Sequence, residues 1–265
     1  MSQAFAEEVR QTHRLLHTPG VIQIRYQGFK GILLLEPQLL DHKVHFRKSM
    51  EKFKVPDEDM RRSCNTLGVV EYSRPYSNGY LNTQITMLLA EAGVSHDYLQ
   101  QLQEEFYDVF KLFPSDYERA ETYLRWIGRP KQLERLHMYG MTEKIKAELK
   151  NLQSTELIKM KRDVGENSLN QQRKPNKGKL RVLVPKSRVV FGVCDPYEYL
   201  SYGECFFQPN LSENESTEFD KATYVVVTRN PCYHPGDIRI LRLKRSAGPL
   251  SHLYDCIVFP VQVCQ

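Results

Sequence analysis

Residues 21–36 read VIQIRYQGFKGILLLE, and the fold is inferred outward from this stretch. Its first six residues alternate apolar and polar side chains, a period of two that is typical of a half-buried strand. Gly28 and Gly31 then bracket a turn, and residues 31–36 form a compact apolar run typical of another strand. With a further strand expected at residues 67–72, the pattern predicts a β-domain over residues 20–73.

The middle of the chain carries helical signals, and strand signals resume after it. We expect helices that begin after the caps Asn82, Ser95 and Asp116, and a fourth helical segment from about residue 131 to 160 with a break near Gly140. An aromatic stripe on the second of these helices is interpreted as core; it consists of Tyr98, Phe106 and Phe110. Later strands are expected at residues 180–184, 188–193, 223–228, 237–243 and 254–259. The order strand, helix, strand predicts an α+β fold.

The composition is that of an ordinary globular protein. The 265 residues include 41% hydrophobic and 26% charged residues and carry a formal net charge of +5, which excludes a disordered, collagen-like or coiled-coil chain. No apolar run approaches the roughly 20 residues of a membrane span, and the first residues lack an apolar signal segment. The six cysteines form no Cys-x-x-Cys pair, so we expect reduced thiols rather than a zinc site. The expected location is intracellular, in the cytoplasm or the nucleus, with no membrane partner.

Cationic residues are most concentrated between residues 171 and 188. This segment holds seven lysines and arginines and no acid, which favours binding of a polyanion. Lys186 and Arg188 lie in Val-Pro-Lys-Ser-Arg between two apolar runs, so we expect an ordered turn to hold them. The alternative is a solvated basic loop without a ligand.

A second cationic group lies in the first β-block and includes Lys30, Arg47 and Lys52. Lys30 lies between Gly28 and Gly31, and glycines there would let a phosphate approach the backbone. The alternative is a simple turn lysine. The segment is not a phosphate-binding Walker loop, because its Gly-x-x-x-x-Gly-Lys-Ser/Thr pattern is absent.

Residues 228–237, TRNPCYHPGD, are expected to form a rigid loop because two prolines and a glycine exclude a helix there. His234 could donate to a phosphate or carry a proton; the alternative is that it bonds only to the loop backbone. Cys232 lacks the His and acid partners of a nucleophile. The sequence contains no hydrolase, kinase, dinucleotide-binding or zinc-protease signature and no cluster of aspartates suited to two metal ions.

Seven segments, taken together and in order, resemble one known family. They are QIRYQGFKG (23–31), FRKSMEKF (46–53), YLNTQI (80–85), VPKSR (184–188) with Gly192, YGE (202–204), NPCYHPGDIR (230–239) and HLYDCIVFP (252–260). The family that they resemble is the eukaryotic cell-encoded RNA-dependent RNA polymerases of RNA silencing. The chain has Gln27-Gly28 where the family usually has Gly-Gly, and Lys186-Ser187-Arg188 where it often has Lys-Gly-Arg.

The resemblance implies two double-psi β-barrel portions joined by a helical segment, the second barrel being incomplete. On this view residues 1–75 are part of the first barrel and residues 76–160 are a helical connector. Residues 161–179 would be a basic linker, and residues 180–265 part of the second barrel.

The resemblance also implies a reaction. The 3′-hydroxyl of a growing RNA attacks the α-phosphate of an NTP on an RNA template, assisted by Mg²⁺, and the double-stranded product serves gene silencing. The implied partners are template RNA, nascent RNA, NTPs and the silencing machinery. The family's Asp-x-Asp-Gly-Asp magnesium ligands follow the Val-Phe-Pro segment and are not found in these 265 residues. We therefore expect no catalytic or metal residue in this chain and no polymerisation by it alone; the alternatives are a non-catalytic RNA-binding module and an incomplete sequence.

What the resemblance carries over is a basic lining for RNA and NTP phosphates. Lys30, Arg47 and Lys52 match first-barrel positions, and Lys186 and Arg188 match second-barrel positions. Arg229, His234 and Arg239 are further candidates.

Overall fold

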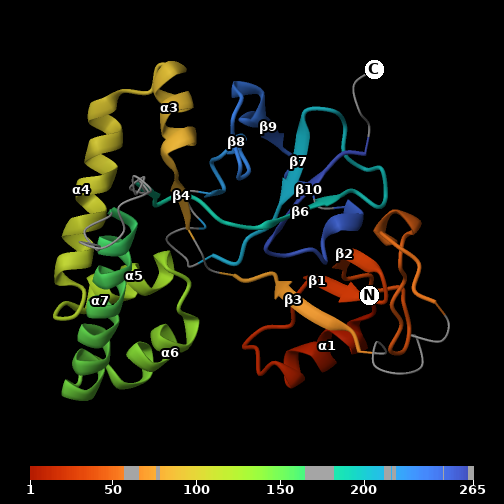
Figure 1. Cartoon of the computed structure of the whole chain (residues 1–265), viewed down its shortest axis with the longest axis horizontal. Coiled ribbons are helices and arrows are strands. Elements are labelled where there is room, and N and C mark those ends of the chain that lie inside the picture. Colours follow the sequence, from red (N-terminus) through yellow and green to blue (C-terminus); the bar gives the residue numbers. More distant parts are fainter. Residues whose placement is uncertain are drawn as a thin grey trace. The chain divides into compact units, whose positions relative to one another are not determined.

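The computed structural model of the chain describes residues 1–56, 66–75, 78–164, 182–211, 216, 219–246 and 248–261. The chain folds into two compact units, and each unit is assembled from segments that are far apart in the sequence (Figure 1). Unit 1 comprises Met1–Pro75, Val190–Val227 and Ile240–Gln265. Unit 2 comprises Tyr76–Val189 and Thr228–Arg239. The fold is mixed α+β, which confirms the predicted class.

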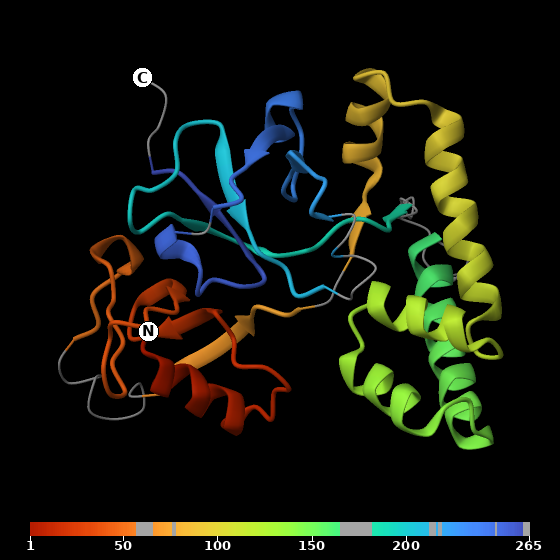
Figure 2. The ribbon, with the colours of Figure 1, turned by 180° about the vertical axis from the view of Figure 1, so that it is seen from behind.

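The first sheet of unit 1 is antiparallel and has the order β2-β1-β3. Its strands are β1 (Val21–Tyr26), β2 (Phe29–Leu34) and β3 (Gly68–Tyr72). The strand expected at residues 31–36 begins earlier because Gln27 and Gly28 both have positive φ angles, 41° and 84°, which gives the two-residue turn a tight hairpin needs. Helix α1 (Gln3–Thr12), capped by Ser2, lies against this sheet (Figure 2). Its Ala6 and Val9 pack into the core of the sheet.

The second sheet of unit 1 has five strands in the order β6-β10-β7-β9-β8. They are β6 (Phe191–Cys194), β7 (Glu204–Phe207), β8 (Tyr224–Val227), β9 (Arg239–Leu243) and β10 (Cys256–Phe259). Strand β10 lies between β6 and β7 and runs parallel to β6 and antiparallel to β7, while β7 and β9 are parallel. The parallel pairs require connections that cross over from one strand to the next. A 3-10 turn, η3 (Gly248–Leu250), precedes β10.

The two sheets of unit 1 share one apolar core. Val21 of β1 is fully buried in a cluster with Phe206 of β7 and Val258 of β10. Burying these side chains together stabilises the folded state by about 25 cal/mol for each Å² of apolar surface removed from water. The first and last thirds of the sequence are therefore packed together, with the helical middle in the other unit.

The helices of unit 2 are α3 (Thr83–Glu91), α4 (His96–Leu112), α5 (Tyr117–Trp126), α6 (Pro130–Tyr139) and α7 (Glu143–Val164). Helices α4 to α7 contribute side chains to a second apolar core. The predicted caps Asn82, Ser95 and Asp116 each accept a backbone N–H in the first turn of their helix, which confirms these starts. The buried members include Phe113 and Tyr123, whose rings stack at 4.1 Å, and Leu136.

A two-stranded antiparallel pair completes unit 2 and leads to the candidate site. It consists of β4 (Gly79–Leu81) and β5 (Val182–Val184), with Gly79 opposite Val184. The Thr228–Arg239 segment of unit 2 contains the short 3-10 turn η2 (Pro235–Asp237). The strand expected at residues 237–243 is accordingly shorter and begins only at Arg239.

Several expectations need correction. Helix α1 and strands β4 and β7 were not anticipated. Tyr98 of the aromatic stripe is 55% exposed, because the buried face of α4 begins with Leu99 and not with Tyr98, whereas Phe106 and Phe110 are buried as predicted. The polar linker expected from residue 161 is helical as far as Val164, and its remainder lies outside the described residues. Within the part of the chain that the structure describes, no helix combines the length and apolarity of a membrane span.

Candidate nucleic-acid interface

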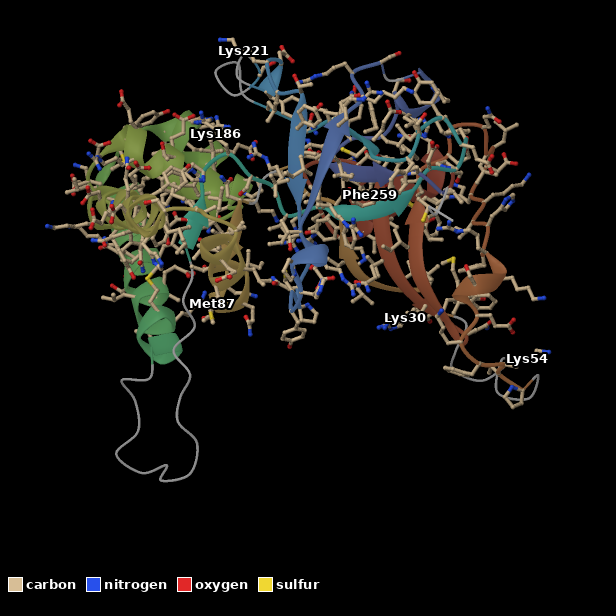
Figure 3. All side chains as sticks on the ribbon, turned by 90° about the horizontal axis from the view of Figure 1, so that it is seen from above. Lys30, Lys54, Met87, Lys186, Lys221 and Phe259 are labelled. Carbon is tan, nitrogen blue, oxygen red and sulfur yellow. The ribbon has the colours of Figure 1, made fainter. Side chains whose placement is uncertain are left out.

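The turn that follows β5 presents Lys186 and holds Arg188. Ser187 Oγ donates to the Val184 carbonyl at 2.6 Å and accepts the Gly79 N–H at 2.7 Å, so one hydroxyl joins the turn to β4. Lys186 is exposed (Figure 3). Arg188 is partly buried, and its Nη1 donates to the Ser187 carbonyl at 2.9 Å. The expected ordered turn is confirmed.

Asn78 fixes this turn from the other strand. Its side chain is only 4% exposed, and its Nδ2 donates to the Val184 carbonyl at 3.2 Å and to the Pro185 carbonyl. Its Oδ1 lies 3.5 Å from Nη1 of Arg188, a long contact. Because a buried amide costs free energy unless its polar atoms are paired, these bonds tie the turn to one arrangement.

The loop that carries Arg229 and His234 is braced from within. His234 Nδ1 accepts the Gly236 N–H at 2.9 Å, so the neutral imidazole carries its proton on Nε2. Asp237 Oδ2 accepts the backbone N–H groups of Tyr233 and His234, both at 3.3 Å. His234 therefore bonds to the loop backbone, as the alternative interpretation of the sequence predicted, and its Nε2–H remains an exposed donor.

The same loop is joined to the start of α3. Asn82 Oδ1 accepts the Ile85 N–H at 2.9 Å as the helix cap, and its Nδ2 donates to Asn230 Oδ1 at 2.7 Å. Asn82 therefore has two functions, capping a helix and holding a loop 148 residues away in the sequence.

The basic residues of unit 1 lie at one end of its first hairpin. The Lys52 N–H donates to the Gly28 carbonyl at 2.9 Å, and Phe29 pairs with Glu51. These contacts bring Lys52 beside the hairpin end that carries Lys30, which is labelled in Figure 3. Arg47 caps the 3-10 turn η1 (Lys48–Met50) through its backbone carbonyl. Its side chain and those of Lys30 and Lys52 are exposed.

The two glycines beside Lys30 are needed for packing inside the protein. A Cβ added to Gly28 would lie 2.1 Å from the Phe53 carbonyl oxygen, and one added to Gly31 would lie 2.7 Å from Met50 Cε. Packing within the protein is therefore reason enough for glycine at both positions, and the approach of a phosphate to this turn stays a prediction.

The arrangement divides the predicted site residues between the units. Unit 2 contains Lys186, Arg188, Arg229, His234 and, at its boundary, Arg239, the first residue of β9; unit 1 contains Lys30, Arg47 and Lys52. No acidic side chain among those the structure describes forms an ion pair with Lys30, Arg47, Lys52, Arg229 or Arg239. Exposed cations without an acidic partner are available for phosphate oxygens.

Nucleophilic or metal chemistry gains no support from the described residues. Across those ranges, no group of three or more His, Cys, Asp or Glu side chains is arranged to hold a metal ion. Burial raises the pKa of Cys205 to about 11 and that of Cys256 to about 12, so both thiols stay protonated at neutral pH. Cys232 is buried within its loop, and Cys64 and Cys264 lie outside the described residues.

Sequence reasoning missed two contributors to this site. Asn78 was not singled out, and Ser187 was noted only as a departure from the family's pattern. Asn82 was identified as a cap, but its bond to Asn230 could not be inferred. A signal for Asn78 is its place directly before Gly79, because a polar residue beside a glycine often marks a turn or a close approach.

The comparison with protein families identifies the class. The family model described as RNA dependent RNA polymerase matches residues 1–263. This chain belongs to the RNA-dependent RNA polymerase family.

Relatives agree with this assignment, and a solved structure has a similar fold. The chain is 31% identical to the probable RNA-dependent RNA polymerase 1 of Oryza sativa subsp. japonica, over 99% of this chain and 33% of the rice protein. It is 28% identical to RNA-dependent RNA polymerase 1 of Arabidopsis thaliana, over 98% of this chain and 22% of that protein. The structure of the RNA dependent RNA polymerase QDE-1 from Thielavia terrestris matches 99% of this chain and 30% of its own, with a TM-score of 0.62 and 19% identity. The chain thus spans a third or less of these proteins.

Proposed function

We propose that this chain is part of a polymerase that copies an RNA template, transferring nucleotides from NTPs to the 3′-hydroxyl of RNA. The observation that carries the proposal is the family match over residues 1–263. Exposed cations support it, because Lys30, Arg47, Lys52, Arg229 and Arg239 form no ion pair with an acidic side chain among the described residues. A role in gene silencing, with silencing proteins as partners, is proposed from the sequence resemblance.

In unit 2, Arg229, Arg239 and Lys186 bind phosphate oxygens of RNA or NTP. Arginine can bind two oxygens of one phosphate with its planar fork, whereas lysine acts as a point charge. His234 donates from Nε2 to a phosphate or ribose oxygen. In unit 1, Lys30, Arg47 and Lys52 supply a second set of phosphate contacts.

We propose further that the β-parts are portions of double-psi β-barrels. The mixed parallel and antiparallel pairing around β10 supports this, since crossed strands are needed to close such a barrel. Mg²⁺ is the cofactor that the family resemblance implies. The described residues offer no ligand set that fits it, so the roles given to this chain's side chains are binding and orientation only.

Binding of single-stranded RNA by the full chain tests the proposal. The probe is a fluorescein-labelled oligouridylate of about 16 nucleotides, within the site sizes of single-strand binders. We expect affinity to fall with salt, and the variant K186A/R229A to bind about 10-fold or more weakly. The slope of log affinity against log salt should fall by about 1.4, from roughly 0.7 per phosphate contact.

The matched control is K146A/K159A, which removes the same charge from α7, where each lysine is paired with a glutamate of its own helix. Equal losses in both double variants, or none in either, would overturn the assignment. Incorporation of labelled NTPs on an RNA template with Mg²⁺ distinguishes a catalytic chain from a non-catalytic RNA-binding module, which would bind without incorporation.

A further inference from the structure

Strand β4 is only three residues long, and an asparagine lies immediately on each side of it. Asn78 holds the turn that carries Lys186, through the carbonyls of Val184 and Pro185. Asn82 holds the loop that carries Arg229 and His234, through Asn230. Both cationic segments are thereby joined to one short piece of extended backbone, residues 78–82, called the β4 segment below.

The β4 segment is itself fixed on three sides. The Asn78 N–H donates to the Trp126 carbonyl at the end of α5, and Gly79 to Leu81 pair with β5. Tyr80 meets Phe106 of the helical core edge-on at 6.2 Å. An extended strand rises about 3.3 Å per residue, so the two asparagines lie about 13 Å apart along the chain.

We infer that the β4 segment is a positioning element, with Asn78 and Asn82 as its positioning residues, which spaces the Lys186 turn and the Arg229 loop so that both bind one phosphate chain. The inference rests on the proposed function. Two weak contacts on one rigid support bind a single ligand more tightly than independent ones, because the second contact forms within the complex already made. Neither asparagine touches the ligand; each acts through the segment that it holds.

The exposed pair Asn82–Asn230 provides the primary test, since its loss should leave the fold intact. Asn230→Ala removes the acceptor without touching the α3 cap. Asn82→Ser retains a capping oxygen but is too short to reach Asn230. We expect each variant to bind the labelled oligouridylate about 5- to 10-fold more weakly, and the double variant N82S/N230A to be no weaker than either single one, because both remove one hydrogen bond.

Coupling to the cations separates positioning from general structure. Once Asn82→Ser has removed the hydrogen bond that holds the loop, Arg229→Ala should lower the RNA affinity little further. The effects of R229A and N82S on RNA affinity should therefore be non-additive. Lys186 lies on the other segment, so the loss of RNA affinity caused by Lys186→Ala should add fully to the loss caused by N82S. For that turn, Ser187→Ala and Asn78→Ala should instead be non-additive with K186A. Additive losses throughout would overturn the inference.

Hydrogen exchange of the unliganded chain separates failure of this inference from failure of the proposed function. We expect faster exchange at the N–H groups of Tyr233, His234 and Gly236 in N82S and N230A, with the first turn of α3 unchanged in N230A. Unchanged exchange in the loop would overturn the inference even if RNA binds. If the wild-type chain shows no salt-dependent RNA binding, the proposed function fails; faster exchange would then leave Asn82 a purely structural residue, which also overturns the positioning role.

Discussion

Tyr197 Oη donates a hydrogen bond of 2.8 Å to Glu36 Oε2, and the two residues follow β6 and β2, strands that belong to the two different sheets of unit 1. Burial, reinforced by this bond to a carboxylate, raises the pKa of Tyr197 to about 12. His252 lies edge-on to the same ring at 6.1 Å, and its Nε2 is 3.2 Å from the Leu35 carbonyl. Polar contacts thus join the two sheets of unit 1 beside their shared apolar core.

Removing this hydroxyl should weaken unit 1 measurably. Tyr197→Phe deletes the donor and leaves the ring in place, so we expect the free energy of unfolding to fall by about 1 kcal/mol, the lower range for a bond to a charged group that is partly exposed. Denaturant unfolding followed by circular dichroism measures it. The control Tyr233→Phe, at a side chain that is 74% exposed, should change stability by less than about 0.5 kcal/mol. Equal effects would show that the Tyr197–Glu36 bond contributes nothing.

Glu204 gives unit 1 a defined acid sensitivity. Its carboxylate accepts the Ser201 N–H at 3.0 Å, which is the largest cause of a pKa below the ordinary glutamate value, and Arg242 and Lys244 lower it further. A carboxyl whose pKa is lower in the folded state contributes stability above its unfolded pKa, near 4.3, and loses it as the pH falls through the folded value.

We therefore expect Glu204→Gln to melt at a lower temperature than wild type at pH 7. The difference in melting temperature should begin to narrow below about pH 4.3, where the carboxylate of the unfolded chain takes up a proton, and should continue to narrow as the pH falls through the lower pKa of the folded state. Thermal melts of both proteins at pH 7, 5 and roughly 3.5 measure this difference in melting temperature. A difference that stays constant over this range would show that packing, and not the charge, makes Glu204 stabilising.

The core of unit 2 can be tested at two neighbouring positions of α6. Leu136 is fully buried, and Leu136→Ala should cost about 2–5 kcal/mol through lost transfer energy and a cavity. Met138 is 65% exposed, and Met138→Ala should change stability by less than about 0.5 kcal/mol. Urea unfolding compares the two variants. Comparable losses would mean that α6 buries a different face.

The helices of unit 2 could be predicted because their starts are set by neighbouring residues. Asn82, Ser95 and Asp116 each satisfy an N–H in the next turn, and a cap of this kind is visible within a few letters of sequence. Gly140, with a φ of 62°, ends α6 where the break was expected.

The missed strands depend on distant partners. Strand β4 has three residues and pairs with β5 about 100 residues later, so no local period identifies it. Strand β7 reads Glu-Cys-Phe-Phe without alternation because both of its faces are covered. The cations of the candidate site could be predicted, because clusters of lysine and arginine are visible in the sequence. Asn78 could not be predicted, because its role depends on two carbonyls more than 100 residues away.

Gly28 and Gly93 form a matched pair for testing why glycine is required beside Lys30. Both have strongly positive φ angles, 84° and 95°, so alanine meets a similar backbone penalty of about 1–2 kcal/mol at each. At Gly93 the added Cβ meets nothing within 4 Å, whereas at Gly28 it would lie 2.1 Å from the Phe53 carbonyl oxygen. That oxygen belongs to the backbone, so relief of the clash requires the strand pairing of Phe29 with Glu51 to shift.

We expect Gly28→Ala to destabilise the chain by at least about 2 kcal/mol more than Gly93→Ala, with faster hydrogen exchange at Lys52, whose N–H is bonded to the Gly28 carbonyl. Denaturant unfolding and exchange measure the two effects. If both variants lost the same stability while only Gly28→Ala lost RNA affinity, the glycine would serve ligand approach after all, and the packing explanation would be wrong.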